Sequence, residues 1–592
     1  MRRTALIAAC AVVTTALAIP AYAGPSKARS AAGQQKEYVV LYKEGVSLDR
    51  ARAAVKSAGG TIVKENTDVG VATIRTTNGG FMADAGHQSA LDGVARNRAV
   101  GEAPKAAPAN AAVAKGSAVK SSAVKSSAVK SRAVEKDGIE GSGAAPLSRA
   151  GGGSAAEPLA GLQWDMKQIH ATSTGSYRVQ PGNRGVLVGV IDTGIDGSHP
   201  DIAPNFNRAL SRNFTTDIPV DANGNEIDGP CEHPSCVDPA DEDDDGHGTH
   251  VASTIASPIN GLGIAGVAPK VTLVNVRAGQ DSGFFFLQPV VDALTYAGDA
   301  GIDVVNMSFY TDPWLFNCPD NPADSPADQA EQRTVIAAHE RALAYAHRHG
   351  VTLVAAAGNE AADYTKTFID TTSPDFADTP GEAPYERTIP PSCVSEPSEG
   401  KDVVDVSALG ISTRKSYFSS FGLPYIDVSA PGGDAYDTAD NKRDVTKAVL
   451  AAYPKALAIA NGQLNPDGTP NVPNVVRSCK GSVCGYYQYL QGTSMASPHA
   501  VGVAALIVSR FGHRDRAHGG LTLGPDATAA ILQGTATAHA CPNPRAFTYT
   551  RLVQQPDGSF QTVTDTHTCE GSKSRNGFYG TGIVDALHAV TR

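Results

Sequence analysis

Two kinds of sequence pattern are missing from most of this 592-residue chain. Beyond residue 23 no apolar stretch approaches the length of a membrane-spanning helix, so we expect no membrane partner. Basic residues are also scarce beyond residue 150, where 29 Lys and Arg stand against 49 Asp and Glu. Phosphate contacts need clustered Lys and Arg, so this acidic balance argues against a nucleic-acid partner. It fits a soluble, secreted protein.

The first 23 residues are unlike the rest. A basic start, Met1-Arg2-Arg3, is followed by an apolar stretch from Ala5 to Ile19 and then by Ala21-Tyr22-Ala23. This order is typical of a secretory signal peptide, with cleavage expected after Ala23. Cys10 lies inside the apolar stretch, which disfavours a lipid anchor at that cysteine. The sequence therefore predicts a signal peptide over 1–23 and an extracellular location.

Cysteine usage agrees with export. Without Cys10 the chain keeps eight cysteines, an even number that suggests disulfides in an oxidising compartment. Proximity in the sequence favours three pairs and leaves a fourth by default: Cys231–Cys236, Cys479–Cys484, Cys541–Cys569 and Cys318–Cys393. Sequence alone does not fix this connectivity, and the Cys231–Cys236 spacing is also compatible with a metal site.

Two segments are expected before the main domain. Residues 36–100 have the pattern of a small α/β unit, with strands at Tyr38–Tyr42 and Val69–Ile74 and helices at Leu48–Ala58 and Ala90–Val100. Residues 101–158 contain the repeat Ala-Val-Lys-Ser and a glycine run, without any aromatic residue before Leu159. Such a composition cannot bury enough surface to fold alone, which predicts a protease-sensitive linker.

From 159 to 592 the pattern is that of a larger α/β domain. Continuous apolar runs, typical of strands covered on both faces, alternate with helical stretches. The runs are Val186–Ile191, Val271–Val276, Val304–Met307, Val351–Ala356 and Val403–Val406, and the helices are His247–Ala256, Pro289–Ala300 and Val335–Arg348. This alternation predicts a three-layer α/β fold with a mainly parallel central sheet. In such sheets ligands bind beyond the carboxyl ends of the strands.

Four polar residues stand at such ends or at helix starts. Asp192 follows the first strand, His247 begins a helix between glycines, and Asn359 follows a later strand. Ser494 lies in a small-residue turn before an apolar helical run, with Pro498 expected in the first helical turn. Each alone is compatible with a structural cap or turn. Together they provide a nucleophile, a base, an acid and an amide donor, which indicates acyl-transfer chemistry.

These stretches resemble those of the subtilisin-like serine proteases, in the same order along the chain. The matching segments are Val190–Gly194, His247–Ala252, Ala357–Asn359, Gly492–His499 and Gly580–Ala586, and the resemblance covers about residues 160–592. It implies that His247 activates Ser494, that Asp192 orients His247, and that Asn359 helps to hold the oxyanion. His250, one helical turn later, is interpreted as structural. Residues 36–100 are similar to the inhibitory prodomain of the family.

The same resemblance implies substrate-binding residues on two strands. They are Asn306, Met307, Ser308, Ala356, Ala357 and Gly358. Phe309 and Tyr310 replace the smaller continuation expected for the family, and their bulk is expected to narrow or reshape the pocket for the residue before the scissile bond. We therefore favour an apolar pocket.

The chemistry predicted here requires no cofactor. Oxygen donors are dense at Asp221–Glu226 and Asp241–Asp245, which makes structural calcium an open alternative to a solvated acidic loop. Neither run is a complete EF-hand loop. Long segments at 215–244, 311–333, 363–400 and 435–489 are rich in Pro, Asp and Gly and are expected to be surface loops.

The hypothesis for the whole chain is a secreted, monomeric serine endopeptidase made as an inactive precursor. Its partners would be protein or peptide substrates and its own prodomain. Two alternatives stay open at this point: peptide ligation or cyclisation by the same residues, and a non-catalytic scaffold on this fold.

Overall fold

A computed structural model describes residues 35–97, 137–138, 157–220, 226–370, 373, 386–555 and 557–592. The expected signal peptide, nearly all of the expected linker and the Asp221–Asn225 part of one acidic run lie outside these residues. Within the described part of the chain, no helix is both long and apolar enough to cross a membrane.

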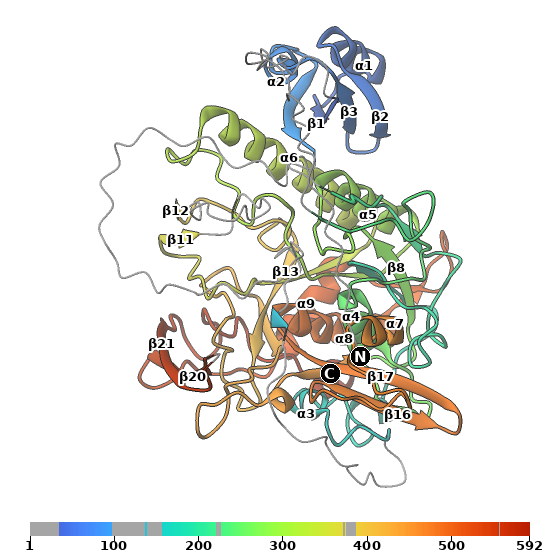
Figure 1. Cartoon of the computed structure of the whole chain (residues 1–592), viewed down its shortest axis with the longest axis vertical. Coiled ribbons are helices and arrows are strands. Elements are labelled where there is room, and N and C mark those ends of the chain that lie inside the picture. The colour runs from blue at the N-terminus through green and yellow to red at the C-terminus, as the bar shows by residue number, and fades with distance from the viewer. Residues whose placement is uncertain are drawn as a thin grey trace, which may run out of the picture.

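Residues 36–96 form a small four-stranded antiparallel sheet with strand order β2-β3-β1-β4. Figure 1 shows this unit at the top, with β1, β2 and β3 labelled. The predicted helix at Ala90–Val100 is wrong. Val94 packs against the helices of this unit whereas Ala95 packs on the opposite face, and such alternation is that of a strand. The elements are β1 (Lys36–Tyr42), α1 (Leu48–Ser57), β2 (Thr61–Asn66), β3 (Val71–Thr76), α2 (Phe81–Gly86) and β4 (Leu91–Arg96).

The main domain is organised by a seven-stranded sheet in which every neighbouring pair is parallel. Its order is β14-β13-β10-β9-β6-β8-β7, so the predicted mainly parallel sheet is confirmed. The strands are β6 (Leu187–Ile191), β7 (Arg212–Asn213), β8 (Thr272–Arg277), β9 (Val304–Met307), β10 (Thr352–Ala356), β13 (Val403–Leu409) and β14 (Val428–Pro431).

Helices cover both faces of this sheet. One hydrophobic core joins α4 and α8 to the face that includes Val188 and Val190, and a second joins α5 and α6 to the face of Ile191 and Val305. This double burial explains why the central strands are continuous apolar runs. The helices are α4 (His247–Ala256), α5 (Leu287–Asp299), α6 (Pro326–Arg348), α8 (Thr493–Phe511), α9 (Pro525–Thr535) and α10 (Ala586–Thr591).

Helix α6 is longer at its start than the predicted Val335–Arg348. Ser325 caps the helix by accepting a hydrogen bond from the backbone N–H of Asp328 at 3.2 Å, and Pro326 occupies its first turn. The preceding segment is not the surface loop that its composition suggested, because Trp314 and Phe316 are almost completely buried.

The remaining elements lie outside the main sheet and the helices that cover it. The segment at 435–489, also expected to be a loop, contains much of a second sheet with the order β15-β17-β16. These elements are α3 (Trp164–Gln168), η1 (Ser176–Arg178), β5 (Asp137–Gly138), β11 (Phe368–Asp370), β12 (Arg387–Ile389), η2 (Val445–Lys447), β15 (Val449–Ala452), α7 (Lys455–Ala460), β16 (Val475–Lys480), β17 (Val483–Gln491), β18 (His513–Arg514), β19 (Leu521–Thr522), β20 (Ala546–Gln554) and β21 (Phe560–Thr568).

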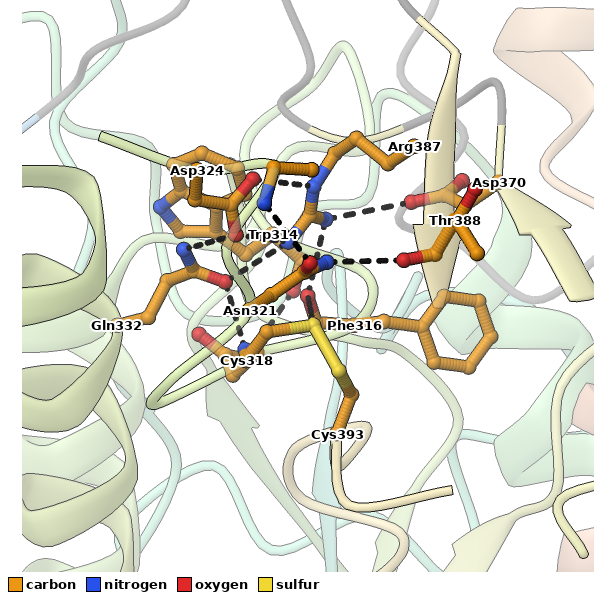
Figure 2. Close-up of a disulfide and its surroundings, with 12 residues drawn as sticks. Trp314, Phe316, Cys318, Asn321, Asp324, Gln332, Asp370, Arg387, Thr388 and Cys393 are labelled. Atoms are coloured by element: carbon orange, nitrogen blue, oxygen red, sulfur yellow. Dashed lines mark hydrogen bonds and ion pairs between the residues drawn. A yellow bond between two sulfur atoms is a disulfide. The ribbon is translucent and has the colours of Figure 1, made fainter. Parts of the chain in front are cut away.

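The eight cysteines of the main domain are joined in the three pairs that proximity suggested and in the fourth pair that remained. Figure 2 shows the bond between Cys318 and Cys393 beside the completely buried side chain of Arg387. The guanidinium group pairs with Asp324 at 2.8 Å and Asp370 at 3.4 Å. Together the disulfide and this ion pair hold the segment that leads into α6.

The small unit lies against α5 and α6 (Figure 1). Apolar side chains of its sheet, among them Val39 and Leu41, belong to the same hydrophobic core as those two helices. At the edge of this contact, Arg96 is 2.7 Å from Glu331 and 2.7 Å from Asp328. The contact is therefore both apolar and ionic.

Candidate active site

Asp192 and His247 are hydrogen-bonded partners at the carboxyl end of a central strand of the main sheet. Asp192 directly follows β6, and His247 is the first residue of α4, after Gly246, whose φ of 92° favours glycine. His247 Nδ1 lies 2.7 Å from Asp192 Oδ1, and both side chains are completely buried. The carboxylate accepts the Nδ1–H hydrogen, which leaves Nε2 as the basic nitrogen. Within the described part of the chain, Nε2 has no hydrogen-bond partner.

Ser494 is the second residue of α8, where backbone N–H groups are not used by the helix. Its hydroxyl donates to Ser308 O at 3.2 Å and not to His247 Nε2. Pro498 is not in the first turn as predicted but inside α8. Proline has no N–H to give the carbonyl four residues earlier, and that carbonyl, Ser494 O, instead accepts from the Ser308 hydroxyl at 3.2 Å.

Asn359 lies just beyond the end of β10 and is hydrogen-bonded to Thr493, the residue before Ser494. Its side-chain Oδ1 accepts hydrogen bonds from Thr493 N at 2.9 Å and from Thr493 Oγ1 at 3.0 Å. Gly358 N in turn donates to Thr493 Oγ1 at 3.1 Å. With Oδ1 engaged, Nδ2 is the part of the amide that can donate into the site. Amide and helix-start N–H groups of this kind can stabilise a developing oxyanion.

Comparison with known proteins agrees with this geometry. A model of the subtilase family, peptidase S8, matches residues 183–580. This chain belongs to the subtilase family. Members of the family are serine proteases, which are hydrolases acting on peptide bonds.

Curated relatives of this subtilase include a thermophilic serine proteinase of Bacillus sp. (strain AK1), which is 28% identical over 336 residues. That match covers 57% of this chain and 55% of the relative, so the chain spans about half of the relative's length. Subtilisin DY of Bacillus licheniformis is 27% identical over 326 residues, covering 55% of this chain and 77% of that protein.

Two solved structures share the fold of this subtilase. The epidermin leader peptide processing serine protease of Staphylococcus aureus is 20% identical, with a TM-score of 0.56 over 94% of this chain and 99% of that chain. Fervidolysin of Fervidobacterium pennivorans, described as a keratinolytic enzyme related to subtilisin, is also 20% identical, with a TM-score of 0.53 over 94% of this chain and 61% of that chain.

Of the residues expected to bind substrate, two are buried inside a strand of this subtilase and four lie at or beyond the ends of strands. Asn306 and Met307 are completely buried in β9, where Asn306 Nδ2 donates to Ser308 Oγ at 2.8 Å and Asn306 Oδ1 accepts from Ser497 Oγ at 2.8 Å. Asn306 therefore faces α8, whereas Met307 packs on the opposite face of the sheet, in the core shared with α5 and α6. The others, Ser308, Ala356, Ala357 and Gly358, continue β9 or form the end of β10 and the loop before Asn359.

Phe309 and Tyr310 point into the core. Each is only 1% exposed, and Phe309 stacks on Phe285 with ring centroids 4.1 Å apart. Their bulk therefore packs against the second core beneath the sheet. His250 is likewise buried, its Nε2 lies near the Val449 and Gln488 carbonyls, and burial lowers its pKa to about 3. A neutral, hydrogen-bonded His250 fits the structural role expected for it.

A group of carboxylates that range from buried to exposed lies around Arg277. Asp217, Glu232 and Asp281 form one potential metal-ligand set, and Asp238, Asp244 and Asp281 form another. Burial raises the pKa of Asp281 to about 8 and that of Asp217 to about 6. Several of their oxygens, including both of Asp217 and Oδ2 of Asp281, have no hydrogen-bond partner among the residues that the structure describes.

The cation that the structure places among these carboxylates is Arg277. Its Nη1 lies 2.9 Å from Asp238 Oδ2, and its other terminal nitrogen pairs with Asp281. Asp244 belongs to the run Asp241–Asp245 that the sequence singled out. Asp217, Glu232 and Asp281 were not found as potential metal ligands from the sequence, because they lie outside that run.

Proposed function

We propose that this protein is a secreted serine endopeptidase, made as an autoinhibited precursor, that hydrolyses peptide bonds through an acyl-enzyme intermediate. The observation that carries the proposal is the buried 2.7 Å hydrogen bond from His247 to Asp192, at the start of the helix α4 that packs against α8, the helix of Ser494. Among the described residues, His247 Nε2 has no hydrogen-bond partner. A histidine held in this tautomer by a carboxylate is suited to serve as a general base.

In the proposed reaction, the Ser494 hydroxyl turns from Ser308 O to His247 Nε2, gives up its proton and attacks the substrate carbonyl carbon. Asn359 Nδ2 and the Ser494 backbone N–H hold the oxyanion. His247 then protonates the leaving amine, and the acyl-enzyme forms. Water, activated by the same histidine, releases the acid product. Asp192 stabilises the imidazolium that appears at both stages.

The test compares the wild-type protein with Ser494→Ala. We expect the wild type to cleave peptides into two hydrolysed products and to be labelled by a serine-reactive phosphonate. Ser494→Ala should do neither. Ligated or cyclic products in the mass spectrum would favour acyl transfer instead, and labelling that persists in Ser494→Ala would exclude Ser494 as the nucleophile.

Two contacts support autoinhibition. The small unit is bound to α5 and α6 through Arg96 and also through Asn66, whose Nδ2 donates to Asp292 at 2.9 Å and Thr295 at 2.8 Å. Separately, β5 pairs antiparallel with the last two residues of β17, placing Gly138 opposite Leu490. β17 leads directly to the Ser494 turn, so residues 137–138 of the linker lie beside the strand that precedes Ser494.

We infer from this placement that the precursor is processed within the linker, close to β5. Ser494→Ala should accumulate as the full-length secreted precursor, and the N-terminus of the mature wild type should fall near residue 137. Addition of active wild-type enzyme is the control, because it should cleave the variant precursor. Normal maturation of Ser494→Ala alone would show that another protease performs the step.

We also propose that the carboxylates around Arg277 bind a structural calcium ion. Calcium prefers several carboxylate oxygens, and such oxygens converge here from separate loops. Two of them pair with Arg277, and several others have no hydrogen-bond partner among the described residues. Catalysis itself would need no cofactor. A chelator should lower the melting temperature of the Ser494→Ala protein, and added calcium should restore it. An unchanged melting temperature, or an equal response in Asp281→Asn, would refute the site.

A further inference from the structure

Asp243 has a buried carboxylate in which both oxygens accept hydrogen bonds. Oδ1 accepts from Gly246 N at 2.8 Å and from Thr193 Oγ1 at 3.1 Å. Oδ2 accepts from Thr249 N at 2.9 Å and from Thr249 Oγ1 at 2.6 Å. The residue is only 5% exposed. A carboxylate that is buried and accepts four hydrogen bonds is a structural element of the domain and does not belong to a solvated acidic loop.

These bonds connect the two halves of the candidate acid–base pair. Thr193 is the neighbour of Asp192, and its hydroxyl also accepts from Gly248 N at 3.1 Å. Gly246 and Thr249 lie on either side of His247 in the chain. The backbones of the two segments are also in direct contact, because a Cβ added at Gly248 would stand 2.0 Å from Gly194 O. One carboxylate thus joins the loop of Asp192 to the start of α4.

We propose that Asp243 is a positioning residue that holds Asp192 and His247 in register for catalysis. The inference rests on the proposed function, since it assigns a role in the same reaction. Asp243 acts through its neighbours, because its carboxylate hydrogen-bonds to Thr193, Gly246 and Thr249 and to neither His247 nor Ser494. A shift of about 1 Å between reacting groups can lower a rate by about 10²-fold, so such positioning is kinetically important.

The chemistry of the site explains why a carboxylate is needed. Each oxygen of Asp243 faces a backbone N–H, of Gly246 on one side and of Thr249 on the other. An asparagine would present its NH₂ group to one of these two N–H groups in either orientation of the amide. Backbone N–H groups cannot turn away as hydroxyls can, so one segment must shift.

The first experiment measures Asp243→Asn against Asp241→Asn. The control removes the same charge two residues earlier, from a carboxylate that pairs with the exposed Arg208. Rates are expressed per active site titrated with phosphonate. We expect Asp243→Asn to lower kcat by about 10²-fold with KM within about twofold of the wild type. Asp241→Asn should change neither constant by more than about twofold.

A second pair of variants serves if Asp243→Asn does not fold. Thr249→Val keeps the shape of the side chain but loses its hydroxyl, whereas Thr249→Ser keeps the hydroxyl and loses the methyl group. We expect the valine variant to lower kcat by about tenfold or more at unchanged KM, and the serine variant to retain wild-type kcat.

The outcomes separate the two hypotheses. A wild type that neither cleaves peptides nor reacts with the phosphonate would refute the proposed function itself. An active wild type with kcat per active site unchanged in Asp243→Asn would overturn only the positioning role. The same holds if Thr249→Ser loses as much activity as Thr249→Val, because packing of the methyl group would then explain the loss.

Discussion

Replacement of Arg387 by methionine should strongly destabilise the main domain. The guanidinium group is completely buried and pairs with Asp324 and Asp370, whose side chains are each only 1% exposed (Figure 2). It also donates to Phe316 O at 3.1 Å and lies over the Trp314 ring, 4.7 Å from its centroid. Methionine fills much of the same volume but leaves two buried carboxylates without their cation.

The size of the effect follows from that burial. Removing one partner of a buried ion pair costs about 3–5 kcal/mol, because the remaining charge is desolvated and uncompensated. The loss should appear as a lower free energy of unfolding with an unchanged dependence on urea concentration. Urea titrations are best made on the Ser494→Ala protein, in which self-digestion should not occur.

Two comparisons make this prediction specific. Arg575→Met is the matched control: Arg575 lies 3.2 Å from Asp427 but is 39% exposed, so its loss should cost less than about 1 kcal/mol. Adding Asp324→Asn and Asp370→Asn to Arg387→Met should recover much of the lost stability, because no uncompensated charge remains. A loss for Arg387→Met no larger than that of Arg575→Met would refute the reasoning.

Three further outcomes are expected. Asn359→Ala should lower kcat by roughly 10²–10³-fold, the loss seen when subtilisin loses one oxyanion donor, and an unchanged kcat would remove Asn359 from the mechanism. Arg96→Gln should leave Glu331 buried without its cation and weaken docking of the small unit by about 2–5 kcal/mol. The weaker docking should be seen as higher residual activity of the precursor. Arg52→Gln is the control and should leave this residual activity unchanged, because Arg52 pairs with Glu65 inside the small unit. Burial raises the pKa of Asp303 to about 8, so the stability linked to this group is present below about pH 4 and is lost as the pH rises through 8. Asp303→Asn should therefore stabilise the protein by roughly 2–5 kcal/mol at pH 8 and hardly at pH 4, and an equal effect at both pH values in urea titrations would contradict the assignment.

Elements whose burial is uniform were predictable from the sequence. Val304–Met307 is a strand with the predicted bounds because both of its faces are covered, and such strands are continuous apolar runs. Elements whose two faces pack against different parts of the protein could not be predicted from the sequence. The segment Leu91–Arg96 was predicted as helix, and only the packing of Ala95 against a core that includes α6 shows why it is a strand.

In the candidate site, the residues could be predicted from the sequence but the contacts between them could not. Asp192, His247, Asn359 and Ser494 could be singled out because each follows a strand or starts a helix, which are local features of the sequence. The hydrogen bonds between Ser308 and Ser494 join residues 186 positions apart, and no spacing rule predicts them.

The sequence by itself determined the alternation of strands and helices, the identity of the polar residues at their ends and the likeness to a protease family. Local propensity and burial patterns carry that information. Only the tertiary structure decided that Asp243 joins Thr193 to Thr249, that Arg387 is buried between two carboxylates and that the small unit rests on α5 and α6. Those contacts connect distant parts of the chain, and their energies exist only once the intervening segments have folded.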